Sequence, residues 1–278
     1  MWTPSALSSS TGAHALVPDD AASGPAQDLA AQPLDRLRSV DAVGGLRGDP
    51  MAACRRTLVS ARHLSPSTQT AALAMLSSLA TDHRVQVPEG EDLRKQAVAG
   101  IQWAMETTLR GTEVIVTPER ATPLRTIGDA HRPEAQRVRA DALQARFHRG
   151  DPLHLVFCCD GQGTPEEDAA YRRKVLIPAR EEGLPLMEHV LPLSRARFPP
   201  GLSGAFILST PEDGPVAFAI RAAQADRIGS ATCLTLWWGD PNGSDCQDIL
   251  REWGRFVEDR TGQTLPSLLG AAAACLPR

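Results

Sequence analysis

The second half of the chain places apolar runs of strand length between turn signals. Leu153 to Cys159 is a continuous apolar run bounded by Asp151-Pro152 and Asp160-Gly161, a pattern typical of a buried strand. Four further segments have similar length and composition and are predicted as strands: Leu186 to Leu191, Gly204 to Ser209, Val216 to Ala222 and Ala231 to Trp238. Together these runs predict a sheet within residues 151–278.

A capped helix is predicted directly after the first of these strands. Thr164, Pro165 and Glu167 form the pattern of a capping box with proline at the first helical position. The helix is expected to run to about Glu182, with Pro178 kinking it or ending it early because proline has no backbone N–H to donate.

A last helix is predicted after the turn Asp240-Pro241-Asn242-Gly243, with Ser244 or Asp245 as its cap. Its core face is formed by four apolar residues at helical spacing: Ile249, Leu250, Trp253 and Val257. The resulting order β-α-β-β-β-β-α predicts a mixed sheet of the α/β or α+β class with flanking helices, in which one parallel crossover precedes mostly antiparallel neighbours.

The first half of the chain is predicted to be mainly helical. Ser65 followed by Pro66 is a helix start, and apolar positions then recur at helical spacing up to residue 80. A second helix is expected from about Glu91 to a stop at Gly111, and a short strand at Val114–Val116. The Arg-rich helix from Pro133 to His148 is interpreted as a solvated face or as a partner surface.

The composition changes near residue 50, before which Ser, Thr, Ala, Pro and Gly dominate. Met1 to Pro18 contain no Asp, Glu, Lys or Arg, and residues 1–30 show no apolar periodicity. We therefore expect a disordered arm at 1–30, a mainly helical region at 31–150 and an α/β region at 151–278, the last two packed as one domain. The arm is interpreted as a signal for type III secretion or as an ordinary loose terminus.

Charge and cysteine usage narrow the class of protein. The net charge is −4 and no basic run occurs, which argues against a nucleic-acid surface. The longest apolar runs are too short to span a membrane. Six scattered cysteines do not form a compact disulfide framework, so a reduced, cytosolic state is expected. No Cys-x-x-Cys or His-x-x-x-His occurs, and neither a metal nor a cofactor is predicted.

The turn from Cys158 to Thr164 is the best candidate for a ligand site. It lies between a strand and a capped helix, where Gly161 and Gly163 would allow close backbone approach and the helix start would favour an anion. Asp240 ends another strand and joins the candidate ligand residues, with Asp160 as a metal-binding partner if the two strand ends adjoin. A glycine-bearing structural turn is the alternative, because neighbouring glutamates would repel a phosphate.

A cysteine nucleophile is the candidate catalytic group. Cys158 or Cys159 would act near the helix start, with His189 as base and Asp160 completing the set. The segment His189-Val190-Leu191-Pro192 resembles part of the bacterial chemotaxis-receptor glutamine deamidases, in which a cysteine precedes a histidine-bearing segment of this kind. That resemblance implies amide hydrolysis or deamidation. Alternatively, both cysteines are small apolar residues and His189 is structural.

Two functional hypotheses follow. The first is a bacterial effector delivered into a host cell, where it would act on a host protein, with a secretion chaperone as a further partner. The second is a non-catalytic binding or adaptor protein of the bacterial cytoplasm, with the Arg-rich helix and an exposed indole of Trp237-Trp238 as its contact surfaces. No motif of a common hydrolase, metalloprotease or kinase occurs.

Overall fold

The computed structural model describes residues 49–88, 92–120, 134–198, 200–209, 215–224 and 232–276. All of these residues belong to one compact unit, residues 45–278, which we call the second unit because the chain is divided after residue 44. The predicted arm at 1–30 lies outside the described residues.

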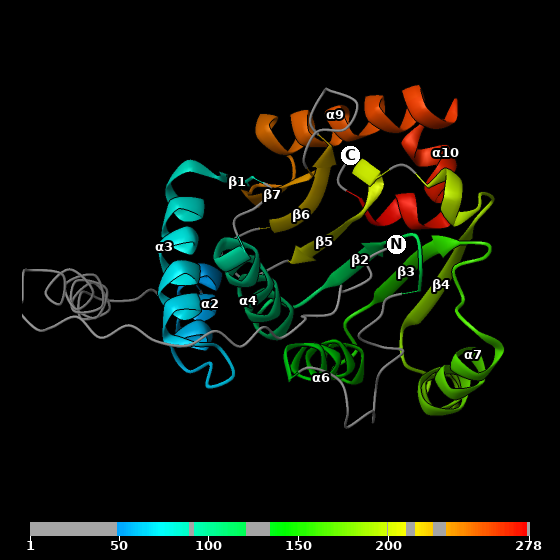
Figure 1. Cartoon of the computed structure of the whole chain (residues 1–278), viewed down its shortest axis with the longest axis horizontal. Helices are drawn as coiled ribbons and strands as arrows, with labels where there is room; N and C mark the ends of the chain where they lie inside the picture. Colours follow the sequence, from blue (N-terminus) through cyan, green and yellow to red (C-terminus); the bar gives the residue numbers. More distant parts are fainter. Residues whose placement is uncertain are drawn as a thin grey trace, which may run out of the picture. The chain divides into compact units, whose positions relative to one another are not determined.

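A mixed seven-stranded sheet forms the centre of the second unit (Figure 1). Its strands are β1 Arg84–Val87, β2 Thr112–Val116, β3 Leu153–Cys158, β4 Leu186–Leu191, β5 Gly204–Ser209, β6 Val216–Gln224 and β7 Thr232–Gly239, in the order β1-β7-β6-β5-β2-β3-β4. Strands β2, β3 and β4 are parallel, whereas β1, β7, β6, β5 and β2 pair antiparallel in turn. The predicted α/β class is confirmed, and the predicted order after residue 151 is observed.

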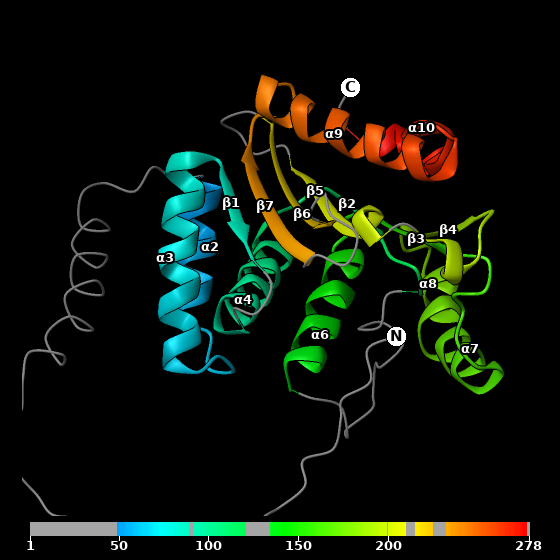
Figure 2. The same cartoon turned by 45° about the horizontal axis from the view of Figure 1, so that its top comes forward.

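Helices cover both faces of this sheet and one of its edges. They are α2 Pro50–Val59, α3 Pro66–Asp82, α4 Asp92–Thr108, α6 Glu134–His148, α7 Pro165–Tyr171, α8 Ile177–Glu181, α9 Ser244–Thr261 and α10 Leu265–Leu269, with short turns η1 Arg172–Leu176, η2 Arg195–Arg197, η3 Pro200–Leu202 and η4 Gly270–Cys275. In Figure 2, α9 and α10 lie on one side of the sheet, and α4, α6 and α7 lie on the other.

Strand β3 is buried on both faces, as its uninterrupted apolar run predicts. Val156 and Cys158 pack with Trp253 and other side chains of the α9–α10 layer. Phe157 lies on the opposite face, in a cluster with Tyr171 of α7 and further residues of α6 and α8. Two separate apolar layers, one on each face, therefore stabilise the sheet. Each fully buried Val, Leu, Ile or Phe side chain in them contributes roughly 1.5–3 kcal/mol to the free energy of folding.

Local sequence signals are confirmed at most helix starts. Ser65 accepts a hydrogen bond from the Thr68 N–H, and Thr164 and Glu167 form the predicted reciprocal capping box. Pro178 lies in the first turn of α8, where its lack of a backbone N–H is tolerated. The π-helical turn η1 precedes it and separates α7 from α8. Helix α9 differs slightly from expectation, since its N-cap is Gly243 and no side chain caps it.

Three further features differ from the sequence predictions. The region predicted as helical contains strand β1, whose four residues are too short for a periodic signal. Trp237 and Trp238 are both buried, with exposed fractions of 2% and 8%, because helices cover both faces of β7. The Arg-rich helix α6 is not simply a solvated face, because it turns Arg146 completely inward.

Candidate functional site

Cys158 has the surroundings of a structural cysteine. It ends β3 with no exposed surface, and its N–H donates to the Pro118 carbonyl at 3.3 Å. Burial raises the pKa of the Cys158 thiol to about 12, and the negative charge of Asp160 adds to the rise. A cysteine nucleophile needs the opposite shift, because the thiolate is the reactive form.

Cys159 and Asp160 tie the end of β3 to the loop after β4. The exposed Cys159 thiol donates to the Leu193 carbonyl at 3.3 Å. Asp160 accepts the Arg195 N–H at 2.7 Å, and its other oxygen lies 3.9 Å from the Arg195 guanidinium. These contacts connect two loops at the same edge of the sheet, which is a structural role for both residues.

His189 is partnered by another histidine. It lies beside Val156 in the β3–β4 ladder and therefore shares a sheet face with Cys158, one diagonal step away. Its Nε2 is 2.9 Å from His154 Nδ1, and the two rings stack with centroids 5.1 Å apart. Burial lowers the pKa of both rings, that of His154 to about 4, so the pair is neutral at neutral pH.

The glycine turn is shaped by packing. A Cβ on Gly161 would lie 2.3 Å from the Pro118 carbonyl oxygen, so only glycine allows the two backbones to approach so closely. Gly163 has φ +91°, and Thr164 begins the capping box. The Glu167 carboxylate already accepts the Thr164 N–H at 2.9 Å, which leaves this helix start disfavoured for a second anion.

Asp240 lies far from the other predicted ligand residues. It directly follows β7 and accepts the Asn242 N–H at 2.8 Å in a turn. Strand β7 runs antiparallel to β3, and three strands separate the two. Because the two strands run in opposite directions, their carboxyl ends lie at opposite ends of the sheet along the strand direction. Asp160 and Asp240 therefore do not meet.

A buried arginine holds the turn in place and was not singled out from the sequence. Arg120 is 1% exposed and pairs with Asp168 at 2.5 Å and Glu188 at 2.7 Å. Its guanidinium lies over the rings of Tyr171 and Phe157, with centroid distances of 4.2 and 5.0 Å. The one available signal was Glu188 itself, an acidic residue inside a predicted strand.

A second buried charge cluster joins α4, α6 and β2. Arg146 lies 3.0 Å from Glu113, and both side chains are fully buried. Arg139 pairs with the buried Glu106 at 2.9 Å. Burial raises the pKa of Glu113 to about 8, with Glu106 adding to the rise and Arg146 opposing it. Both clusters lie on the face of the sheet that α9 does not cover.

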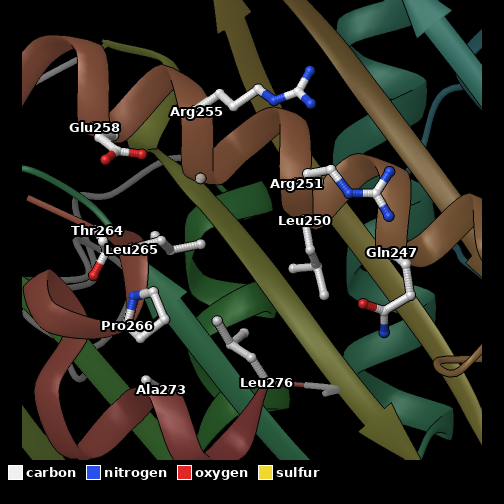
Figure 3. Close-up of a pocket in the computed structure, with 11 residues that line it drawn as sticks. Gln247, Leu250, Arg251, Arg255, Glu258, Thr264, Leu265, Pro266, Ala273 and Leu276 are labelled. Atoms are coloured by element: carbon white, nitrogen blue, oxygen red, sulfur yellow. The ribbon is translucent and has the colours of Figure 1, made fainter.

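A groove of about 510 Å³ opens on the other face, between α9 and the C-terminal segment (Figure 3). It is lined by residues of α9, α10 and η4: Gln247, Leu250, Arg251, Gly254, Arg255, Glu258, Thr264, Leu265, Pro266, Ala273 and Leu276. In the figure, the side chains of Leu250, Leu265 and Leu276 converge on this space. Arg251 and Arg255 project from α9 at its edge. The groove thus has an apolar floor and a polar rim.

Gly254 forms part of the groove wall in the middle of α9. A Cβ at this position would meet only Leu265 Cβ at 4.0 Å, an ordinary van der Waals contact. Glycine inside a helix is destabilising by about 0.5–1 kcal/mol relative to alanine. Packing within the described residues therefore gives no reason for glycine here, and its effect is to keep the groove deep.

Comparison with known proteins identifies no relative: no family model, no curated protein and no solved structure matches the chain. Within the described ranges, no helix is both long and apolar enough to cross a membrane. The same residues contain no group of three or more His, Cys, Asp or Glu side chains that could hold a metal ion.

Proposed function

We propose that this protein is a binding protein that holds a segment of a partner protein in the α9 groove. The observation that carries the proposal is the 510 Å³ groove with its apolar floor and polar rim. Its volume is within the range of about 300–1,000 Å³ that is usual for ligand sites. The surroundings of Cys158 and His189 give less support to cysteine-dependent hydrolysis, because the thiol is buried and His189 bonds to His154.

Gly254 supports binding at this place. Glycine makes α9 less stable than alanine would at this position, and no close contact of the described residues requires glycine there. A glycine with this property is explained if a partner approaches the helix backbone closely. Leu250 and Leu265 beside it supply apolar surface for a bound side chain.

The arginines at the rim of the groove indicate which charge the bound segment should carry. Arg251 and Arg255 are one helical turn apart, and both line the groove. Arg251 is paired with Asp248, whereas Arg255 is exposed and forms no ion pair with a described residue. We therefore assign the groove to a segment that carries aliphatic side chains for the floor and a carboxylate for Arg255.

Peptide selection tests this assignment. Phage-displayed random peptides are selected on the full chain and are then titrated against Gly254→Leu, whose side chain fills the groove. The selected peptides should combine Leu, Ile or Val with Asp or Glu, and a synthetic copy should lose binding to the variant. Thermal unfolding confirms that the variant is folded. Selected peptides that bind Gly254→Leu as well as the original protein would refute the groove as the site.

The delivery hypothesis rests on a separate observation, the absence of charged residues from Met1 to Pro18. We propose that this segment directs type III secretion of the binding protein into a host cell. A reporter fused to residues 1–50 should then reach the host cytosol through a type III apparatus. Retention of the fusion inside the bacterium would contradict delivery and favour the adaptor of the bacterial cytoplasm.

A further inference from the structure

A second cavity, of about 440 Å³, lies on the other side of the molecule from the α9 groove. It is formed by the segment before α3, by α3 and α4, and by one residue of α6: His63, Leu64, Ser65, Thr68, Gln96, Ala99, Gly100, Trp103 and Arg139. The cavity differs from the groove because it combines aromatic rings with fixed hydrogen-bond donors.

The aromatic wall consists of Trp103 and His63. Their rings form an edge-to-face pair with centroids 4.4 Å apart and an interplanar angle of 79°. Leu64 and Ala99 add apolar surface beside them. Aromatic rings gain from offset or edge-to-face contact with further rings, so this wall favours a planar aromatic group.

Arg139 supplies a donor in a fixed orientation. Its Nε and Nη2 donate to Glu106 Oε1 at 3.1 and 2.9 Å, and Glu106 is fully buried. Gln102 also donates to Glu106, at 3.0 Å. Nη1 of Arg139 makes no hydrogen bond to a described residue, so its N–H groups are available on the side of the guanidinium away from Glu106.

Gln96 supplies a second donor. Ser65 and Thr68 share a hydrogen bond of 2.8 Å, and the Thr68 hydroxyl donates to Gln96 Oε1 at 3.1 Å. The acceptor oxygen of Gln96 is thus used inside the protein, and its amide NH₂ remains to donate. These two donors match a ligand group that only accepts, which is the chemistry of a carboxylate.

We propose that this cavity is a small-molecule site for an aromatic carboxylate, with the ring against Trp103 and His63 and the carboxylate directed to Arg139 and Gln96. This site is independent of the proposed peptide groove, since none of its lining residues lines that groove. It gives the protein a second ligand of a different chemical class.

The test uses 2-naphthoate as the probe and its neutral amide, 2-naphthamide, as the control. Titration of the full chain is followed through the indole N–H resonance of Trp103, assigned with Trp103→Phe. 2-Naphthoate should shift this resonance saturably. The amide should bind at least about tenfold more weakly than 2-naphthoate. The reason is that a hydrogen bond to a charged group contributes more free energy than a hydrogen bond to a neutral group. Equal affinity for both probes would overturn the carboxylate assignment.

A cavity-filling variant separates specific binding from surface adsorption. Ala99 is exposed on α4 and lines the cavity, so Ala99→Leu should fill the site and abolish the 2-naphthoate shift. Ala74→Leu is the matched control, since Ala74 is equally an exposed helical alanine but does not line the cavity. Unchanged binding by Ala99→Leu, or no saturable shift in the original protein, would overturn the proposal.

Discussion

Helices α6 and α9 are similar in length and both carry several arginines, yet they use them in opposite ways. In α6, Arg146 is fully buried and Arg139 is partly buried, and each pairs with a glutamate from another element. In α9, Arg251 and Arg255 are exposed at the rim of the groove. Arginine content alone therefore does not distinguish a helix whose arginines are buried in ion pairs from one whose arginines stay exposed.

The physical difference lies in the partner of each guanidinium. Burying a charged side chain costs roughly several kcal/mol of folding free energy, unless an opposite charge and further hydrogen bonds compensate for the lost hydration. Arg146 meets that condition, because it faces Glu113 and donates to the carbonyls of Leu109 and Gly111 at 2.6 and 2.7 Å. Arg255 remains hydrated, so its charge is available to a partner. The arginines of α6 therefore belong to the core of the protein, whereas those of α9 that line the groove stay on its surface.

The largest expected effect is that of Arg146→Ala. Above about pH 8, where Glu113 is charged, removing this side chain leaves a buried carboxylate without its counter-ion, and at any pH it leaves the carbonyls of Leu109 and Gly111 without a donor. We expect a loss of about 3–5 kcal/mol in the free energy of unfolding at pH 9, measured by urea denaturation. Arg255→Ala is the matched variant in α9 and should change stability by less than about 0.5 kcal/mol. Similar losses in the two variants would contradict the contrast between the helices.

A smaller effect concerns the pH dependence of the α6 cluster. Since folding raises the pKa of Glu113 from an ordinary value to about 8, the folded state holds this proton more tightly than the unfolded state. The resulting stabilisation is full below about pH 4.5 and is lost as the pH rises through about 8. Relative to Glu113→Gln, the original protein should lose on the order of 1 kcal/mol or more between pH 5 and pH 8.

Denaturation curves of both proteins across that range provide the measurement. The difference between them isolates Glu113, because groups with lowered pKa values, such as Asp151 and Asp168, are present in both proteins and change stability in the opposite direction. A difference that does not vary with pH would show that Glu113 is charged in the folded protein throughout.

The smallest effect concerns glycine in two helices. Gly254→Ala should raise the free energy of unfolding by about 0.5–1 kcal/mol, because a Cβ there meets only Leu265 at 4.0 Å. Gly100→Ala in α4 should not be stabilising, since its Cβ would approach Leu64 Cδ1 to 2.9 Å. Melting temperatures of the two variants measure the contrast. A Gly254→Ala variant no more stable than the original protein would remove the argument that Gly254 is kept for a partner.

Local elements could be predicted where the sequence carries a local cause. The strands at 186–191 and 204–209 match their predicted bounds, because apolar runs there are enclosed by turn residues. The capping box at Thr164 is likewise a short-range pattern. Strand order could not be predicted in the same way, since β2 pairs with both β3 and β5 through contacts distant in sequence.

The candidate sites depend on long-range contacts even more. The burial of Arg120 requires Glu188, 68 residues away, and no local pattern links the two. The sequence predicts Gly161 as a position where a ligand could approach the backbone closely, and the group that approaches it in the structure is the Pro118 backbone. The groove forms only where α9 and the segment from Thr264 to Leu276 lie side by side. The position of Gly254 in its wall therefore could not be predicted from the sequence.

A reciprocal charge exchange at the groove tests the central claim most directly. An acidic, leucine-rich peptide from the selection and its copy with each Asp and Glu replaced by Lys are titrated calorimetrically against the original protein and Arg255→Glu. The account predicts that the original protein prefers the acidic peptide and that Arg255→Glu prefers the basic one, while Arg173→Glu on the opposite side of the sheet behaves like the original. An unchanged preference in Arg255→Glu would contradict recognition at this groove.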